Sequence, residues 1–369
     1  IILRSGSILF VEKNLLTEKV FLFLEVLDMK LLKITADGLP LFKGKFDMCF
    51  YAQQRVSEDQ KDILYSLFSN IYLNPANGFI GINASGKTSV LKVILLSLGI
   101  INNEPINHIE TRDILGNTEK AVLNIFFYLE SNKEICRLET MITSKQTKTE
   151  GIVYRILSEK IWSKQTDEVI TRKSMLDFDD KEPVMFRSGQ EDFLPDDVSI
   201  MIARNKKTGE NMRVVNLLQF TNINVLPFSD NIPAEVITYL DPTVESLRFD
   251  EMDQKAVIRL KFQGKDEIVM NDPIQLNNYL SSGTVKGMIT FTLAQEVLQK
   301  GGYIVVDEIE KLLLSFLLSL YCAVRPIELP FLLIRRMIFA WKEYRCCSPC
   351  ISDPMAMSLI LSSSGTSLI

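Results

Sequence analysis

Residues 81–88 carry the clearest chemical signal in this sequence, because Gly81-Ile82-Asn83-Ala84-Ser85-Gly86-Lys87-Thr88 matches the pattern G-x-x-x-x-G-K-[ST] in full. In such a P-loop the glycines let backbone N–H groups wrap a chain of phosphates, the lysine reaches the β- and γ-phosphate oxygens, and the hydroxyl ligates Mg²⁺. A glycine turn followed by an exposed lysine is the alternative. The pattern predicts a nucleotide-binding set of Gly81, Asn83, Ala84, Ser85, Gly86, Lys87, Thr88 and Ser89.

Two adjacent carboxylates follow an apolar segment later in the chain. Residues 302–306 read as a buried strand, and Asp307 and Glu308 come directly after it. A buried parallel strand delivers its last residues to the edge of the sheet where nucleotides bind. There Asp307 can hold Mg²⁺ through water, and Glu308 can polarise the attacking water as a general base. Apolar strands that end in acids are common, so the prediction depends on the preceding P-loop.

A third segment, Leu280-Ser281-Ser282-Gly283-Thr284, precedes a predicted helix over residues 285–300 that stops at Gly301-Gly302. Small hydroxyl residues and glycine at a helix N-terminus can cradle an anion, although such a sequence is usually only a helix cap. Its place about two dozen residues before the carboxylate strand makes Ser282 and Gly283 candidate phosphate-binding residues.

The elements that must position these residues follow from apolar spacing. The P-loop lies between a short apolar stretch at 78–80 and a predicted helix from Thr88 to Leu98 that Gly99 closes. Alternation of apolar and polar residues predicts strands over 29–51 and 120–173, and strands again at 256–262 and 267–270. Apolar spacing predicts a helix over 57–70 with Ser57 as its N-cap, and a largely helical stretch over 174–250.

Composition narrows the possible functions. The 369 residues carry 41 Lys+Arg and 46 Asp+Glu, and the formal net charge of −5 argues against strong non-specific attraction to nucleic acid, leaving a local basic patch open. The single histidine, His108, excludes a multi-histidine metal site, and we expect a loop position for it rather than a catalytic role. Two of the six cysteines lie far apart and the other four fall in the last fifty residues, which favours a reducing compartment and a cytoplasmic location.

The two ends differ from the middle of the chain. Residues 1–28 precede the first methionine, Met29, and we expect a non-native or disordered extension there; charged residues interrupt its apolar run, which disfavours a secretory signal. Only nine of the 59 residues over 311–369 are charged, against 24 % of the whole chain. Its apolar run, 312–324, is shorter than the roughly 20 residues that span a bilayer, so no membrane association is expected. A frameshifted or misjoined end after Glu310 is our hypothesis, which sequencing the gene across codon 310 would test.

The three motifs together resemble a known family. The order GxNASGKT, LSSG before a helix and an apolar strand with Asp-Glu is similar to that of ABC-type ATPases. More narrowly, residues 83–88, 281–287 and 307–310 resemble AAA-type ATPases grouped with the OLD family, relatives of the SMC and RecF head domains. The resemblance covers about 29–310. It implies an α/β fold, a P-loop NTPase with an ABC-type head (a mixed sheet flanked by helices) and a strand-rich inserted region.

This resemblance also implies a domain division. The first half of the ATPase head with its P-loop would span 29–119, an inserted region of strands and helices 120–270, and the second half of the head 271–310, followed by the atypical tail 311–369. The family implies ATP and Mg²⁺ as cofactors, with Thr88 and Asp307 as metal ligands and Lys87 and Glu308 as catalytic residues. The switch histidine that the family carries one strand after its acidic pair has no counterpart here, and Gln146 matches the Q-loop glutamine by position only.

The function that the resemblance implies is slow Mg²⁺-dependent ATP hydrolysis coupled to closure of a head-to-head homodimer. In such a dimer Lys87, Asp307 and Glu308 of one subunit close over ATP with Ser282 and Gly283 of the other. Members of the family often serve in bacterial or phage-defence modules, so a nuclease or another effector protein is an expected partner. Two alternatives stay open: a nucleotide-gated protein-binding module with negligible hydrolysis, and a P-loop kinase that phosphorylates a small acceptor.

Overall fold

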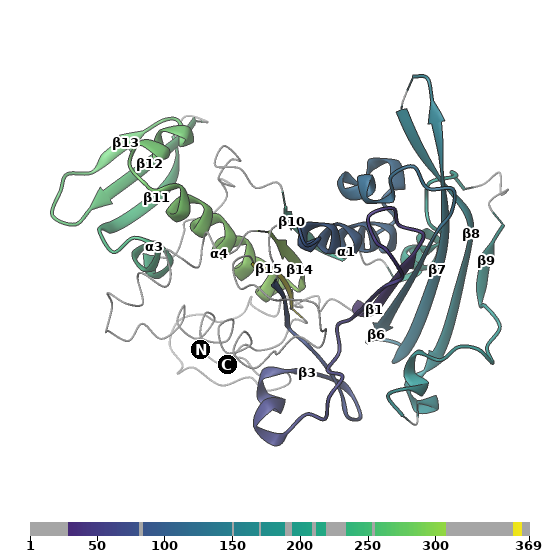
Figure 1. The fold of residues 1–369 in the computed structure, drawn as a ribbon. Coiled ribbons are helices and arrows are strands. Elements are labelled where there is room, and N and C mark those ends of the chain that lie inside the picture. Colours follow the sequence, from purple (N-terminus) through teal and green to yellow (C-terminus); the bar gives the residue numbers. More distant parts are fainter. Residues whose placement is uncertain are drawn as a thin grey trace.

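The structure is a computed structural model, and Figure 1 shows its fold. It describes residues 29–80, 84–149, 151–169, 171–188, 194–208, 212–218, 234–252, 255–307 and 357–363. The expected extension 1–28 and most of the tail, 311–356 and 364–369, lie outside the described residues.

A six-stranded antiparallel sheet forms one side of the molecule, with the strand order β2-β1-β6-β7-β8-β9. Buried and less buried residues alternate along its long central strands, as expected for a sheet with one face on the core. Its strands are β1 (Met29–Asp37), β2 (Phe46–Cys49), β6 (Ala121–Leu129), β7 (Glu134–Thr147), β8 (Gly151–Gln165) and β9 (Met185–Arg187). The predictions of strands within 29–51 and of antiparallel strands within 120–173 are therefore confirmed.

A four-stranded sheet lies at the centre, with the order β10-β14-β15-β5. Its strands are β5 (Ala76–Ile80), β10 (Val214–Leu217), β14 (Gly302–Val306) and β15 (Met357–Ser363). β10 and β14 run parallel, whereas β15 is antiparallel to both of its neighbours, β14 and β5. The tail therefore contributes β15 to this sheet, between the strand that precedes the P-loop and the strand that precedes Asp307.

Two long helices pack on the central sheet: α1 (Lys87–Ile101) contacts β10 and β15, and α4 (Ser282–Lys300) contacts β14 and β15. Figure 1 shows α1 between the central sheet and the six-stranded sheet. Most residues of α1 from Leu91 onward are buried, and the leucines and isoleucines among them belong to one core with β1, β6 and β7. Burying a side chain of this size stabilises a fold by about 1.5–3 kcal/mol, so this core holds the P-loop helix firmly.

A second core lies around the N-terminal half of α4, the half away from β14. It combines the first half of α4 with α3 (Ala234–Leu240), a 3-10 helix (Pro273–Asn278), and the antiparallel strands β11 (Val244–Met252), β12 (Lys255–Phe262) and β13 (Ile268–Met270). Arg259 of β12 pairs with Asp250 of β11 and with Glu267, directly before β13, and Lys261 of β12 pairs with Glu245 of β11. The predicted strands at 256–262 and 267–270 are confirmed, and β11 was missed.

Several predicted elements were wrong. Residues 57–70 form a 3-10 helix (Glu58–Ile63) and a hairpin of β3 (Tyr65–Phe68) and β4 (Ile71–Leu73), not one helix, because Ser69 takes a left-handed conformation with φ of 51° and turns the chain. Gly99 does not end α1, which continues to Ile101. The described part of 174–250 is not largely helical: it contains α2 (Met201–Thr208), α3, β9, β10, β11 and a 3-10 helix (Ser174–Leu176).

The expected boundary at residue 119/120 does not separate two sheets. β6 pairs along its length with β1, so strands from both sides of that boundary share the six-stranded sheet. Backbone hydrogen bonding continuous across β2, β1 and β6 makes residues 121–165 part of the body that packs on α1. The first half of the expected inserted region is therefore integral to this body.

Candidate functional site

The turn that leads into α1 has an unusual backbone. β5 ends at Ile80, residues 81–83 lie outside the described residues, and Ala84 and Gly86 then adopt positive φ angles of 63° and 92°. A left-handed conformation costs a residue with a Cβ about 1–2 kcal/mol, which explains glycine at position 86 and marks Ala84 as strained.

The helix α1 begins directly at Lys87, with Gly86 as its N-cap. The first N–H groups of a helix have no partner within the helix, and the helix dipole favours negative charge near them. The first turn of α1 contains no acidic residue that would occupy these groups. Lys87 and Ser89 are half-buried and Thr88 is exposed at this end, so the predicted phosphate-binding residues 84–89 are clustered at one helix terminus.

Asp307 meets this terminus from the central sheet. It follows β14 directly and is only 9 % exposed, and the Thr88 hydroxyl donates a hydrogen bond of 2.6 Å to Asp307 Oδ2. The two residues are 219 positions apart in the sequence. The fold therefore brings together the two predicted metal ligands.

The residues present fit Mg²⁺. Mg²⁺ prefers oxygen ligands in an octahedron and usually keeps several waters beside one or two protein ligands and substrate phosphates. The Thr88 hydroxyl oxygen could take one position, and the Asp307 carboxylate, 2.6 Å from that oxygen, could accept a hydrogen bond from a metal-bound water. Within the described ranges no group of three or more His, Cys, Asp or Glu side chains could hold a metal by itself.

The far end of α1 is fixed by two asparagines. Asn102 bonds the backbone of Met212 in both directions, accepting from its N–H at 2.8 Å and donating to its carbonyl at 2.6 Å. Asn205 of α2 donates to the Ile101 carbonyl at 2.7 Å. Asn205 of α2 thus satisfies one free carbonyl at the C-terminus of α1, and the Asn102 side chain ties this end of the helix to Met212, which lies two residues before β10.

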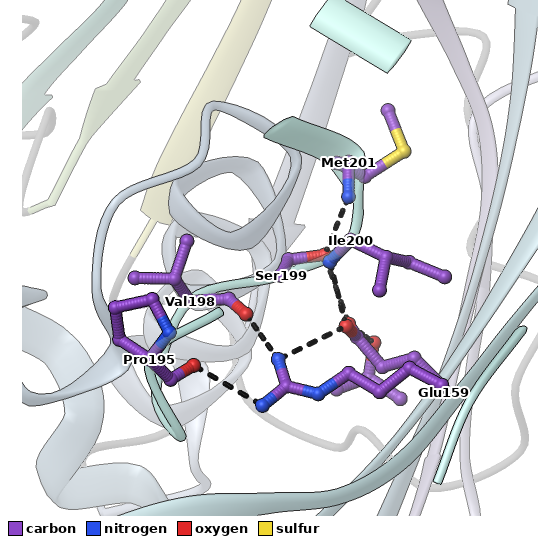
Figure 2. Close-up of polar contacts among 8 residues, drawn as sticks. Glu159, Pro195, Val198, Ser199, Ile200 and Met201 are labelled. Carbon is purple, nitrogen blue, oxygen red and sulfur yellow. Dashed lines mark hydrogen bonds and ion pairs between the residues drawn. The ribbon is translucent and has the colours of Figure 1, made fainter. Parts of the chain in front are cut away.

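A buried ion pair in turn anchors the segment that carries α2 (Figure 2). Glu159 of β8 accepts hydrogen bonds of 2.8 Å from the Thr140 hydroxyl, the Ser199 hydroxyl and the Ile200 N–H. Arg187 of β9 lies 3.9 Å from the Glu159 carboxylate and donates to the carbonyls of residues 195 and 198. Burial raises the pKa of Glu159 despite these donors. The network joins residues 195–201 to the six-stranded sheet.

The predicted LSSG motif begins α4, as expected of a helix cap. Ser281 is the N-cap, and its hydroxyl accepts from the Thr284 N–H at 3.0 Å. Ser282 and Gly283 are the first residues of α4 and Ser282 is exposed. This end of α4 belongs to the second core, and a helix of 19 residues is about 28 Å long. Ser282 and Gly283 therefore lie at the opposite end of α4 from the residue that leads into β14.

Other predicted residues have simpler placements. Gly81, Asn83 and Glu308 lie outside the described residues. Gln146 is exposed near the turn between β7 and β8, which favours a surface role. His108 ends a 3-10 helix (Ile106–His108). Sequence reasoning missed Asn102, Asn205 and the Glu159–Arg187 pair, and only Asn102, directly after an apolar helix, gave a local signal of a helix end.

Comparisons with protein-family models and with curated proteins found no match to this chain. Among the described residues, no helix combines the length and the apolar character needed to cross a membrane.

Proposed function

We propose that this chain binds ATP with Mg²⁺ and hydrolyses it slowly, in a homodimer that closes over the nucleotide. The observation that carries the proposal is the 2.6 Å contact between Thr88 at the start of α1 and Asp307 after β14. A hydroxyl and a carboxylate from motifs 219 residues apart share one point beside a helix N-terminus that has no acidic residue in its first turn. This arrangement supports phosphate and Mg²⁺ binding better than a glycine turn with an incidental lysine.

Each residue has a distinct part in the proposed reaction. The P-loop backbone and Lys87 hold the phosphates, and Thr88 and Asp307 hold Mg²⁺, which when bound offsets the negative charge of the phosphates. Glu308, the residue after Asp307, accepts a proton from the attacking water as general base. This role for Glu308 depends on the sequence pattern.

The position of Ser282 and Gly283 supports a site shared between subunits. They open α4 within the second core, whereas Thr88 and Asp307 lie at the central sheet. Exposed residues at the start of a helix can contact the phosphates bound by another copy, which would make both subunits necessary for one complete site. We further propose a cytoplasmic role in a bacterial defence module with an effector such as a nuclease, on the family resemblance alone.

Phosphate release from ATP·Mg²⁺ tests the proposal. The wild-type chain is compared with Lys87→Ala, which removes the phosphate-binding ammonium, and with Glu308→Gln, which keeps the shape of the side chain and removes its basicity. We expect Lys87→Ala to abolish ATP binding, and Glu308→Gln to retain binding and accumulate a dimer. Normal hydrolysis by the Gln variant would overturn the role of Glu308. Binding without turnover in the wild type would favour the nucleotide-gated protein-binding module instead.

A further inference from the structure

Tyr303 occupies a special position on β14. Side chains in a strand alternate between the two faces, so Tyr303, Val305 and Asp307 point to one face of the central sheet. Tyr303 and Val305 pack in the core that contains α1 and the six-stranded sheet. Tyr303 is therefore on the face from which Asp307 reaches Thr88.

The hydroxyl of Tyr303 has a defined partner in the other sheet. It accepts a hydrogen bond of 2.8 Å from the backbone N–H of Leu31, which lies 272 residues away on β1. The ladder between β1 and β6 is irregular here, because Leu31 is opposite Phe127 while Lys33 is opposite Phe126. A buried N–H group at such a bulge needs an acceptor, and the Tyr303 hydroxyl supplies it.

The backbone around Tyr303 is also fixed. Its N–H donates to the Arg213 carbonyl at 2.8 Å, and Gly302, with φ of 125°, lies so close that a Cβ there would approach the same carbonyl oxygen to 2.5 Å. The start of β14 is thus held at its backbone by the residue before β10 and at its side chain by β1. Asp307 stands four residues further along the extended strand, about 13 Å away.

We propose that Tyr303 is a positioning residue for the nucleotide site: its hydroxyl fixes β14 against the bulge of β1 and so sets the place of Asp307 relative to Thr88. The contact also connects the six-stranded sheet to the strand that carries the metal ligand. The consequence for Mg²⁺ rests on the proposed function, whereas the link between Tyr303 and the Thr88–Asp307 contact does not.

The first experiment compares ATP affinity with Mg²⁺ and with EDTA in Tyr303→Phe, which removes one oxygen and keeps the ring that fills the core. Tyr154→Phe is the matched control. Tyr154, on β8, is also 3 % exposed, and its hydroxyl donates to the Gly116 carbonyl at 3.0 Å. We expect Tyr303→Phe to weaken binding several-fold in Mg²⁺ and to leave it unchanged in EDTA, and Tyr154→Phe to change neither. Equal affinities of Tyr303→Phe and wild type in Mg²⁺ would overturn the proposal.

A second experiment needs no nucleotide. Unfolding midpoints in urea are measured for Tyr303→Phe, Thr88→Val and the double variant, alongside the same cycle with Tyr154→Phe. In the first cycle we expect the double variant to shift the midpoint by less than the sum of the two single variants, because Tyr303→Phe already weakens the Thr88–Asp307 bond. In the cycle of Tyr154→Phe with Thr88→Val we expect the shifts to add. Additive shifts in both cycles would contradict the positioning role. A non-additive cycle in a protein that binds no ATP would retain this role and reject the proposed function.

Discussion

At the scale of single residues, the proposed Mg²⁺ site depends on Thr88 and Asp307, which the fold itself holds together. The hydroxyl of one and the carboxylate of the other are joined at 2.6 Å, and Asp307 is almost fully buried. A preformed pair of oxygens saves the cost of ordering two side chains when the ligand binds. The affinity that this pair contributes should therefore appear only when Mg²⁺ is present.

Replacing Asp307 by Ala should affect ATP binding only when Mg²⁺ is present. If Asp307 holds Mg²⁺ through water, its loss should weaken ATP binding in Mg²⁺ by roughly 10- to 100-fold and leave binding in EDTA unchanged, as measured by calorimetry. Asp113→Ala is the control, because Asp113 is an exposed carboxylate that pairs with Lys92 of α1 away from the helix start. Equal losses with and without Mg²⁺ would show that Asp307 acts on the fold and not on the metal.

Glu159 predicts a pH dependence of stability. Burial raises its pKa in the folded protein, above a value of about 4.3 in an unfolded chain. Folding therefore favours the protonated carboxyl, and this contribution is complete below the unfolded pKa and is lost as pH rises through the folded pKa. The free energy of unfolding of the wild type, relative to the non-titrating Glu159→Gln, should fall as pH rises above about 4.3. Urea unfolding at a series of pH values measures it, and a constant difference would contradict the direction of the shift.

At the scale of elements, the succession of α4 and β14 was predictable because local chemistry and tertiary structure agree. Ser281 caps the helix, Gly301 ends it with φ of 81°, and a run of buried residues follows at once. The strands β7 and β8 were predictable for the same reason, since buried and less buried residues alternate along much of each strand and the alternation is visible in the sequence. The first half of β6 alternates in the same way, and its second half is an apolar run buried on both faces. The motifs also predict that residues 88 and 307 lie close together, because the family resemblance implies that both bind Mg²⁺.

Other elements depended on partners that the sequence does not reveal. The apolar residues of 63–67 have helical spacing, yet the chain turns at Ser69 and the Tyr65 hydroxyl reaches Glu130 at 2.6 Å. The charged residues of β11 interrupt the alternation that would predict a strand. The strand forms through its backbone pairing with β12, where Arg259 also pairs with Asp250. The hydrogen bond between Tyr303 and Leu31 joins two sheets across 272 residues, and nothing near either residue announces it.

Two glycines with the same backbone angle offer a test of packing between elements. Gly38, after β1, and Gly151, at the start of β8, both have φ of 77°. A Cβ on Gly38 would lie 2.2 Å from the Lys120 carbonyl oxygen, whereas a Cβ on Gly151 would meet no atom within 4 Å. Gly151→Ala should cost about 1–2 kcal/mol from backbone strain alone, and Gly38→Ala clearly more because backbone must move. Denaturant unfolding measures both, and equal costs would show that residues 38 and 120 separate easily.

At the scale of the whole molecule, α4 connects the second core to the central sheet. Its first half packs among α3 and β11–β13, and its last residues lead into the strand that ends at Asp307. A packed helix moves as a rigid unit, so a shift of β14 on nucleotide binding would be transmitted to the second core and to the exposed Ser282. The same helix would thus report on the site of its own subunit and contribute to the site of the other.

Mixing two inactive variants distinguishes a shared site from one built within a single chain. Lys87→Ala destroys the P-loop half and Ser282→Arg places a bulky side chain at the exposed start of α4, so each homodimer should lack turnover. In a two-fold dimer a mixed pair pools both defects in one site and leaves the other intact, so equal amounts should recover about a quarter of wild-type phosphate release. A mixture of Lys87→Ala with Thr88→Val is the control, because both changes damage the P-loop half and every site stays defective. Recovery in the first mixture and not in the second would establish that Ser282 acts across the dimer; wild-type turnover by Ser282→Arg alone would remove Ser282 from the site.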